Sequence, residues 1–148
     1  MPDLYITRAQ PNPKGRDRTS RTTVQNAQLN EEWVEFRVDN TRNLTGDEII
    51  HRTYDSACRM TGSESLYRFG SVSVTPGKTV RVHTGSGTDG WAGNTYHAYM
   101  GYGWYKWNND CGDQITIAYS GTTIDYAAYG AKPREGELVR QYGANTLA

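Results

Sequence analysis

The chain has 148 residues, and its 16 lysine and arginine side chains balance 16 aspartate and glutamate side chains. This length suits one domain with a core of its own, and the zero net charge excludes a protein that a global field draws to nucleic acid or to an anionic membrane. No apolar run approaches the ~18 residues of a membrane span, and the first residues, "MPDLYITRAQ", lack the charged and apolar regions of a secretory signal peptide. We therefore expect no membrane insertion, and either a cytoplasmic location or a place in a particle that is assembled in the cytoplasm and then released.

The N-terminal part of the chain predicts one short strand over residues 4–9 ("LYITRA") and then a long polar loop over residues 11–28. The first thirty residues carry five basic side chains against two acidic ones. Two interpretations stay open for this segment: an ordinary solvated loop, or a basic arm that contacts a partner. Guanidinium groups make planar, bidentate contacts, so in the second case the contact residues are Arg16, Arg18 and Arg21.

Strands with a period of two follow this loop. Residues 31–38 ("EEWVEFRV") alternate apolar side chains, from Val34 onward, with the polar or amphipathic side chains that begin at Trp33. This is the pattern of a half-buried strand. Shorter strand candidates lie at residues 47–54 ("DEIIHRTY") and 66–69 ("LYRF").

Two hairpins are predicted in the second half of the chain. Residues 71–84 ("SVSVTPGKTVRVHT") surround a Thr-Pro-Gly-Lys turn, in which proline presets φ and glycine permits a positive φ. Residues 113–129 surround a turn at Ser120 and Gly121. The side chains predicted to face inward are Val34, Phe36, Val72, Val74, Val80, Val82, Ile115, Ile117 and Tyr119.

About seven to nine short strands separated by Gly, Pro and Asn turns, with no sustained 3.6-residue apolar stripe, indicate an all-β sandwich over residues 1–130. The C-terminal tail, residues 131–148, has little apolar content. It is either disordered or lies on its own sandwich or on a neighbouring molecule. If it lies on a neighbour, Leu138 and Tyr142 are its expected anchors.

Four segments along the chain share an order with a known family: "GRDRTS" (15–20), "LNEEWVEF" (29–36), "YRFGSVSVTPGKTVRVHTGSG" (67–87) and "YMGYGWYKWNNDCGDQITI" (99–117). They resemble segments of bacterial lamin tail domains, which are immunoglobulin-like modules. The resemblance covers roughly residues 4–130, and several matches in register are more specific than any single motif. It implies an immunoglobulin-like β-sandwich that is not catalytic.

Both cysteines occur where the chain departs from this family pattern. The family has a Gly-Trp in its middle strand, where this chain reads "HRTYDSACRM" and includes Cys58. Cys111 is an addition inside an Asn-Asn-Asp-Gly-Asp turn. Because the two departures look as if they were introduced together, we expect a disulfide between Cys58 and Cys111.

The segment "NNDCGD", residues 108–113, brings two asparagines, two aspartates and a thiol together. A calcium loop of the EF-hand type needs oxygen ligands at positions 1, 3 and 5 and a glutamate at position 12. Counted from Asn108, position 5 is Gly112 and position 12 is Tyr119, so the pattern fits poorly. A turn capped by its own Asn and Asp side chains needs less and is favoured.

No other motif predicts a cofactor, a metal ion or catalysis. "GSGTDG" (85–90) matches a dinucleotide-binding pattern, but the residues that follow do not form a helix whose N-terminus receives a pyrophosphate. The three histidines and two cysteines show no metal-ligand spacing. No nucleophile lies in a recognisable context, so we expect that the protein is not an enzyme and uses no cofactor.

The aromatic segment, residues 91–107, holds seven of the 17 Phe, Trp and Tyr residues of the chain. Three interpretations stay open: a protein-contact surface, a surface that stacks sugars or bases, or a loop whose rings form their own small core. The six rings that we expect to make contacts are Trp91, Tyr96, Tyr99, Tyr102, Trp104 and Tyr105.

Together these features predict a non-enzymatic structural or protein-binding module. A copy without an enzyme domain suggests a subunit of a larger assembly, such as a filament, shell or particle, with the protein itself as its partner in a homo-oligomer. The alternative is a glycan- or nucleic-acid-binding module that uses the aromatic segment.

Overall fold

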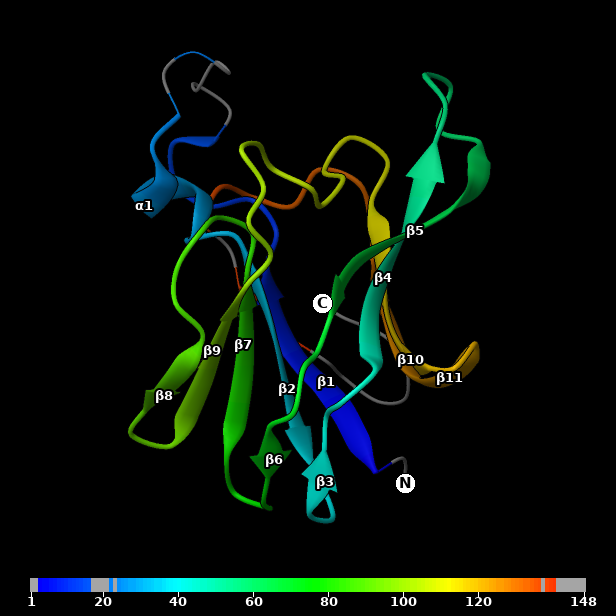
Figure 1. The fold of residues 1–148 in the computed structure, drawn as a ribbon. Helices are drawn as coiled ribbons and strands as arrows, with labels where there is room; N and C mark the ends of the chain where they lie inside the picture. Colours follow the sequence, from blue (N-terminus) through cyan, green and yellow to red (C-terminus); the bar gives the residue numbers. More distant parts are fainter. Residues whose placement is uncertain (1–2, 17–21, 23, 137, 141–148) are drawn as a thin grey trace.

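Two β-sheets pack face to face in the computed structural model and enclose the core between them (Figure 1). The structure describes residues 3–16, 22, 24–136 and 138–140. One sheet has the strand order β12-β1-β2-β7-β9-β8, the other has the order β11-β10-β4-β5, and β3 pairs separately with β6. The elements are β1 (Leu4–Gln10), α1 (Asn26–Leu29), β2 (Trp33–Val38), β3 (Arg42–Asn43), β4 (Asp47–Tyr54), β5 (Met60–Arg68), β6 (Ser73–Val74), β7 (Thr79–His83), β8 (Gly90–Ala92), β9 (Thr95–Tyr99), β10 (Asp113–Tyr119), β11 (Thr122–Tyr129) and β12 (Val139–Arg140).

The predicted all-β sandwich is confirmed, but the described residues form more strands than the seven to nine expected. β3, β6 and β12 are two residues long and β8 is three residues long, too short to show a period of two. β9 lies inside the aromatic segment and pairs in parallel with β7, whereas the other pairs are antiparallel. The single helical turn α1 lies within and just after the predicted polar loop. Within the described residues, no helix has the length and apolar character needed to cross a membrane.

The core forms where the alternating apolar faces of the two sheets meet. Most of the residues predicted to face inward are buried, including Phe36, which is 1% exposed and packs edge-to-face on Phe69. Val72 is only half-buried against this core. Tyr119 was assigned wrongly: it is 51% exposed, because it is the last residue before the Ser120–Gly121 turn and lies beyond the end of the core.

The hairpin predicted over residues 71–84 forms its turn but not its strand pairing. The Lys78 N–H donates to the Thr75 carbonyl oxygen at 3.2 Å, and Gly77 takes a φ of 92°. However, β6 pairs with β3, and β7 pairs with β2 and β9. The period-two pattern was therefore right about strands and faces, but it carries no information about which strand is the neighbour.

The outward face of β2 is less exposed than its alternation predicts. Trp33 and Glu35 are both buried. The guanidinium groups of Arg8 and Arg81 both contact the Glu35 carboxylate, and both lie over the Trp33 ring. Two cations and a ring therefore cover a carboxylate that the pattern placed in solvent.

Described parts of the N-terminal loop and of the C-terminal tail contact each other and the sandwich. β12 pairs with β1 of the same chain, and the Asn12 side chain donates to the Pro133 carbonyl oxygen at 2.9 Å. Of the alternatives left open for the tail, residues 139–140 therefore follow one, pairing with their own sandwich. Leu138 is half-buried just before β12, whereas Tyr142 lies outside the described residues.

We expect Phe36→Ala to lower the free energy of unfolding by about 3–5 kcal/mol, because a large buried ring leaves a cavity between the sheets. Urea denaturation followed by tryptophan fluorescence measures this change. Met60→Ala is the matched control, since Met60 is 57% exposed and its truncation should cost at most about 0.5 kcal/mol. Equal losses in the two variants would contradict the assigned core.

Candidate functional site

An open pocket of about 580 Å³ lies at one end of the sandwich, between the β4–β5 hairpin and the loop of residues 100–112. Its walls come from both elements. Two buried carboxylates, Asp113 and Glu32, hold the loop in place. The lining residues are Arg16, His51, Arg52, Thr53, Tyr54, Glu64, Trp104, Tyr105, Lys106, Trp107, Asn108, Asn109 and Asp110.

A disulfide ties the two elements together. Cys58, in the turn between β4 and β5, is bonded to Cys111 of the loop, with Cα atoms 5.3 Å apart. The predicted pairing of the two cysteines is therefore present. Asp55 supports the turn, because its Oδ1 accepts the N–H groups of Ala57 and Arg59 at 2.9 Å.

The segment "NNDCGD" is a turn, as predicted. Asn108 Oδ1 accepts the Cys111 N–H at 2.9 Å. Gly112 has a φ of 77°, and a Cβ at this position would lie 2.5 Å from the Tyr129 carbonyl oxygen, so the turn requires glycine. In the part of the chain that the structure describes, no group of three or more His, Cys, Asp or Glu side chains is arranged to hold a metal ion.

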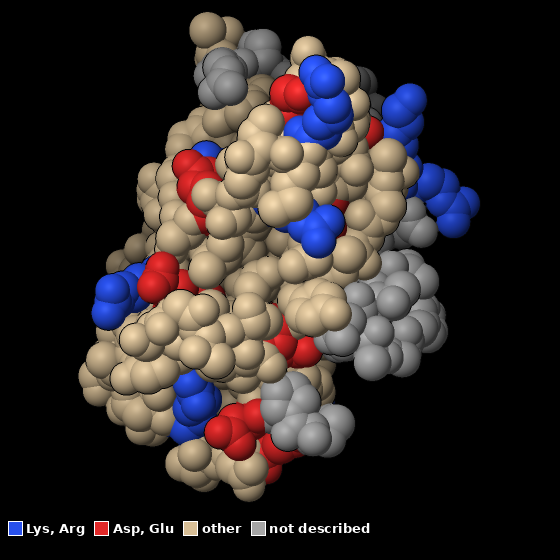
Figure 2. All heavy atoms as spheres, turned by 90° about the vertical axis from the view of Figure 1, so that its right-hand side faces the viewer, with Lys and Arg blue, Asp and Glu red and all other residues tan. Residues whose placement is uncertain are grey.

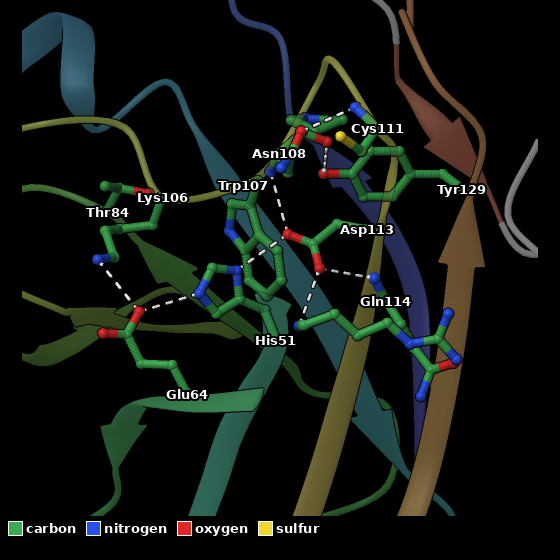
Figure 3. Close-up of polar contacts among 12 residues, drawn as sticks. His51, Glu64, Thr84, Lys106, Trp107, Asn108, Cys111, Asp113, Gln114 and Tyr129 are labelled. Atoms are coloured by element: carbon green, nitrogen blue, oxygen red, sulfur yellow. Dashed lines mark hydrogen bonds and ion pairs between the residues drawn. The ribbon is translucent and has the colours of Figure 1, made fainter. Parts of the chain in front are cut away.

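Asp113, the first residue of β10, connects three elements through one buried carboxylate (Figure 3). Its Oδ1 accepts the N–H of Arg52 in β4 at 3.1 Å, and its Oδ2 accepts the N–H of Asn108 in the loop at 3.0 Å. Oδ2 also lies 2.9 Å from His51 Nδ1. Several charge-assisted hydrogen bonds thus compensate the desolvation of this carboxylate.

His51 bridges two carboxylates. Its Nδ1 faces Asp113, and its Nε2 lies 3.0 Å from Glu64 Oε1 on β5. Lys106 Nζ contacts the same Glu64 oxygen at 3.2 Å, and the Trp107 ring packs edge-to-face on the imidazole (Figure 3). Because carboxylate oxygens only accept hydrogen bonds, both ring nitrogens must carry a proton, so the geometry selects the imidazolium form.

The electrostatics agree with this geometry. Burial opposes protonation of His51, but hydrogen bonding and charge from Asp113 and Glu64 outweigh it, so the pKa of His51 is raised above its ordinary 6.5. The hydrogen bond from His51 in turn lowers the pKa of Glu64. The pair is therefore strongest at pH values where Glu64 is ionised and His51 is protonated.

Glu32 holds the loop of residues 100–112 from beneath. Its carboxylate accepts the Thr84 hydroxyl at 2.6 Å and the Lys106 N–H at 2.8 Å. Complete burial raises its pKa to about 7, although the charge of Arg16 and the hydrogen bonds act in the opposite direction. Arg16 Nη1 lies 2.5 Å from Glu32 Oε2, and its guanidinium lies over the Tyr105 ring.

This position of Arg16 fits neither of the two interpretations of the N-terminal segment, a solvated loop or an outward basic arm. Its Nη2 donates to the Trp107 carbonyl oxygen at 2.8 Å, and its side chain is 15% exposed. Pairing with a buried carboxylate accounts for its place within the fold. Arg18 and Arg21 lie outside the described residues.

The aromatic segment does not form one surface, because its rings divide among several environments. Trp91 on β8 is 45% exposed and lies against Tyr96 of β9. Tyr99 stacks on His83, whereas Tyr102 is half-buried on the core and its hydroxyl donates to the Leu66 carbonyl oxygen. Trp104 is half-buried and lies edge-on to a buried ring, Tyr105.

The sequence did not lead us to predict a site around His51. His51 had been considered only as a metal ligand. A signal for it existed, because the alternation of β4 places His51 on the same inward face as Ile49, and a buried histidine needs hydrogen-bonding partners. The identity of those partners depends on the pairing of β4 with β5 and β10, which sequence alone does not supply.

No protein-family model matches this chain, and no curated protein does. The fold and the site define an all-β sandwich with an open polar pocket at one end. A disulfide links the two elements that form the walls of this pocket.

Replacing both cysteines, in Cys58→Ser with Cys111→Ser, should lower the free energy of unfolding by about 4 kcal/mol, because the disulfide closes a long loop in the unfolded chain. The cysteines are separated by 53 residues. Urea denaturation with and without a reductant measures the change. The reductant should destabilise the wild type and leave the double variant unaffected; a wild type equally stable in both conditions would contradict a structural role for the bond.

The contribution of His51 to stability should depend on pH with a defined sign. Because its pKa is raised in the folded state, its stabilisation is fully present below the ordinary value of 6.5 and is lost as the pH rises through the raised value. The opposite sign holds for Glu64, whose lowered pKa makes its contribution fade as the pH falls below its ordinary 4.5. The difference in stability between wild type and His51→Gln should therefore be largest at pH values above the ordinary 4.5 of Glu64 and below the raised pKa of His51.

Thermal unfolding of the wild type and His51→Gln from pH 5 to pH 9 measures this dependence. The comparison cancels the titration of Glu32, which is present in both proteins and also favours the folded state at lower pH. A stability difference that stays constant or grows toward pH 9 would show that His51 is not held as an imidazolium.

Proposed function

We propose that this protein is a non-enzymatic protein-binding module that associates with copies of itself through the open edge of the β8–β9 hairpin, as a subunit of a larger assembly. One observation carries the proposal: Trp91 is 45% exposed on a sheet edge. Within the described residues β8 pairs only with β9, so its outer backbone groups face away from the sheet. Such an edge accepts a further strand, and an exposed tryptophan beside it supplies an anchor.

Hydrogen bonds hold both ends of the β8–β9 hairpin. Lys78 Nζ donates to Asn94 Oδ1 at 2.6 Å, and the Thr79 N–H donates to the Asn94 carbonyl oxygen at 2.9 Å. At its other end, Asp89 Oδ1 accepts the Tyr99 N–H at 3.0 Å. A contact surface that is already ordered loses little conformational entropy on association, which favours binding.

The resemblance to bacterial lamin tail domains supports the same proposal, because it implies a non-catalytic module. The disulfide favours the released particle over the cytoplasm as its place of action, since structural disulfides persist in oxidising surroundings. The alternative, stacking of sugars or bases along the whole aromatic segment, has less support because the rings do not form a line. Acidic and basic side chains are also interspersed on the face shown in Figure 2, without the continuous basic patch that nucleic-acid binding favours.

We expect Trp91→Ala to weaken self-association by about 30-fold, the effect of losing a typical aromatic hot spot. Size-exclusion chromatography with light scattering, over a range of concentrations, measures this against the monomer mass of 16.6 kDa. Tyr126→Ala is the matched control, because Tyr126 is a similarly exposed aromatic residue (40%) on another strand, β11.

Circular dichroism checks that both variants remain folded. A wild type that stays monomeric at all concentrations would refute self-association. A Trp91→Ala protein that assembles as the wild type does would refute the β8–β9 edge as the contact.

A further inference from the structure

We propose that the outer face of β1 and β2 holds a binding site for a doubly charged oxyanion, a phosphate or sulfate group. An open hollow of about 480 Å³ lies there, lined by Tyr5, Thr7, Arg8, Glu35 and Arg37. This volume is within the range of about 300–1,000 Å³ that is usual for small-molecule sites. The inference is independent of self-association, because β7 separates these strands from the β8–β9 hairpin and the two regions share no residue.

A β-bulge brings to this face a cation that a regular strand would turn inward. The register of β1 with β2 shifts between Ile6 and Arg8, so that Arg8 lies opposite Glu35. Ile6 and Ala9, three positions apart, both face the core. The two residues between them, Thr7 and Arg8, therefore both point outward, and both line the hollow. Bulges are often found where a side chain is re-aimed beside a functional site.

Cations outnumber anions here when the described charged side chains that line the hollow, or pair with its lining, are counted. The lining holds the guanidinium groups of Arg8 and Arg37 and one carboxylate, that of Glu35. Arg81 of β7 adds a third cation, since its Nη2 lies 2.6 Å from Glu35 Oε2. Three positive charges against one negative charge leave an excess of two, which a dianion balances and a single carboxylate does not.

The acidic residues next to this end of the two strands do not occupy the hollow. Asp3 lies just before β1 and Asp39 just after β2, and neither lines it. Asp3 is directed to another cation, with its Oδ2 3.7 Å from Arg42 Nη1. Asp39 forms no ion pair with Arg37. The excess of positive charge around the hollow is therefore not neutralised by the ends of its own strands.

The guanidinium groups keep donors for a ligand, whereas the carboxylate is fully engaged. Arg37 is exposed and makes no hydrogen bond or ion pair with any residue that the structure describes. Arg8 contacts Glu35 through Nε alone, and although its face lies over the Trp33 ring, the N–H groups of its terminal nitrogens point outward in its own plane. Both Glu35 oxygens already accept a guanidinium N–H, from Arg8 and from Arg81. Guanidinium groups with unused donors suit phosphate or sulfate oxygens, which they bind in pairs.

A neutral hydroxyl donor stands beside Arg37. Tyr5 is the cross-strand partner of Arg37, is half-buried and lines the hollow. Its phenol O–H is a donor that adds no charge. Thr7 adds none, because its hydroxyl already donates to the Glu35 carbonyl oxygen at 3.3 Å. The donors for an oxyanion thus come from both strands, Tyr5 and Arg8 from β1 and Arg37 from β2.

An NMR titration of the full chain tests the proposal at constant ionic strength and about pH 8, where a phosphate carries close to two negative charges. The probes are inorganic phosphate, inorganic sulfate and phenyl phosphate, with acetate as the singly charged comparison. We expect the dianions to shift the backbone signals of β1 and β2 and the Nε–H signals of Arg8 and Arg37, with a Kd of about 1 mM. Acetate should bind at least about tenfold more weakly. Tighter binding of phenyl phosphate than of phosphate supports a site for an ester-borne group, and equal affinities support a site for the free ion.

Arg37→Gln should weaken the binding of phosphate at least about tenfold, because it removes one of the guanidinium groups with unused donors. Arg59→Gln is the matched control: it makes the same change of charge at an arginine that is 80% exposed in the turn between β4 and β5. It should bind phosphate as the wild type does. Tyr5→Phe removes only a hydroxyl and should weaken the binding about threefold, through loss of a neutral donor.

Circular dichroism checks that the variants remain folded, and Tyr5→Phe keeps the test decisive if Arg37→Gln fails to fold. The proposal is overturned if no dianion binds at about 10 mM, or if acetate binds as tightly as phosphate. It is also overturned if the folded variants of the hollow retain wild-type affinity, or if Arg59→Gln weakens the binding as much as Arg37→Gln does.

Discussion

The carboxylate of Asp113 is the contact on which one end of this sandwich depends. It lies at the start of β10, where it receives N–H groups from β4 and from the loop of residues 100–112 and a ring nitrogen of His51. Without these donors a buried carboxylate costs several kcal/mol. With them, one side chain fixes the relative positions of a strand, a loop and a hairpin that share few backbone hydrogen bonds at this end.

Glu32 performs the same task for the neighbouring part of the loop, where it accepts the Lys106 N–H. Side chains therefore replace the backbone ladder that would hold a strand in this position, and each carboxylate has a cation beside it, Arg16 for Glu32 and His51 for Asp113. The arrangement has a chemical consequence. A loop held by backbone pairing is insensitive to pH near neutrality, whereas a loop held by a histidine and a carboxylate with raised pKa values is sensitive to it.

Sequence reasoning recovered those parts of this structure that depend on local pattern. The inward faces of β2, β7 and β10, the turns at Gly77 and Gly121 and the capped turn before Asp113 all follow from alternation and turn chemistry. The pairing of the two cysteines was anticipated because both occur where the chain departs from the family pattern. The site was not predicted, because its residues come from β4, β5, β10 and a loop, and their meeting depends on the order of strands in a sheet.

The inward place of Arg16 could not be predicted for a related reason. Arg16 looks solvated in the sequence because its neighbours are polar, and the partner that buries it, Glu32, lies sixteen positions further on. Charge counting along a segment cannot distinguish a free cation from one that is paired inside the fold. The same limit applies to Glu35, which the alternation of β2 placed in solvent and which two arginines enclose.

The edge strands differ in how they are protected against pairing with another chain, and this difference bears on the proposed function. β12 covers the outer side of β1 with a short pair. β5 carries the charged Glu64 and irregular register opposite β4, and β11 has a bulge and turns Asp125 inward to accept the Ile6 N–H. These are devices that prevent sheets from associating edge to edge. β8, with the sequence Gly-Trp-Ala, has neither a charge nor a bulge. The neutral, aromatic edge of β8 therefore differs from the edges at β5 and β11, and this difference supports the proposed contact there.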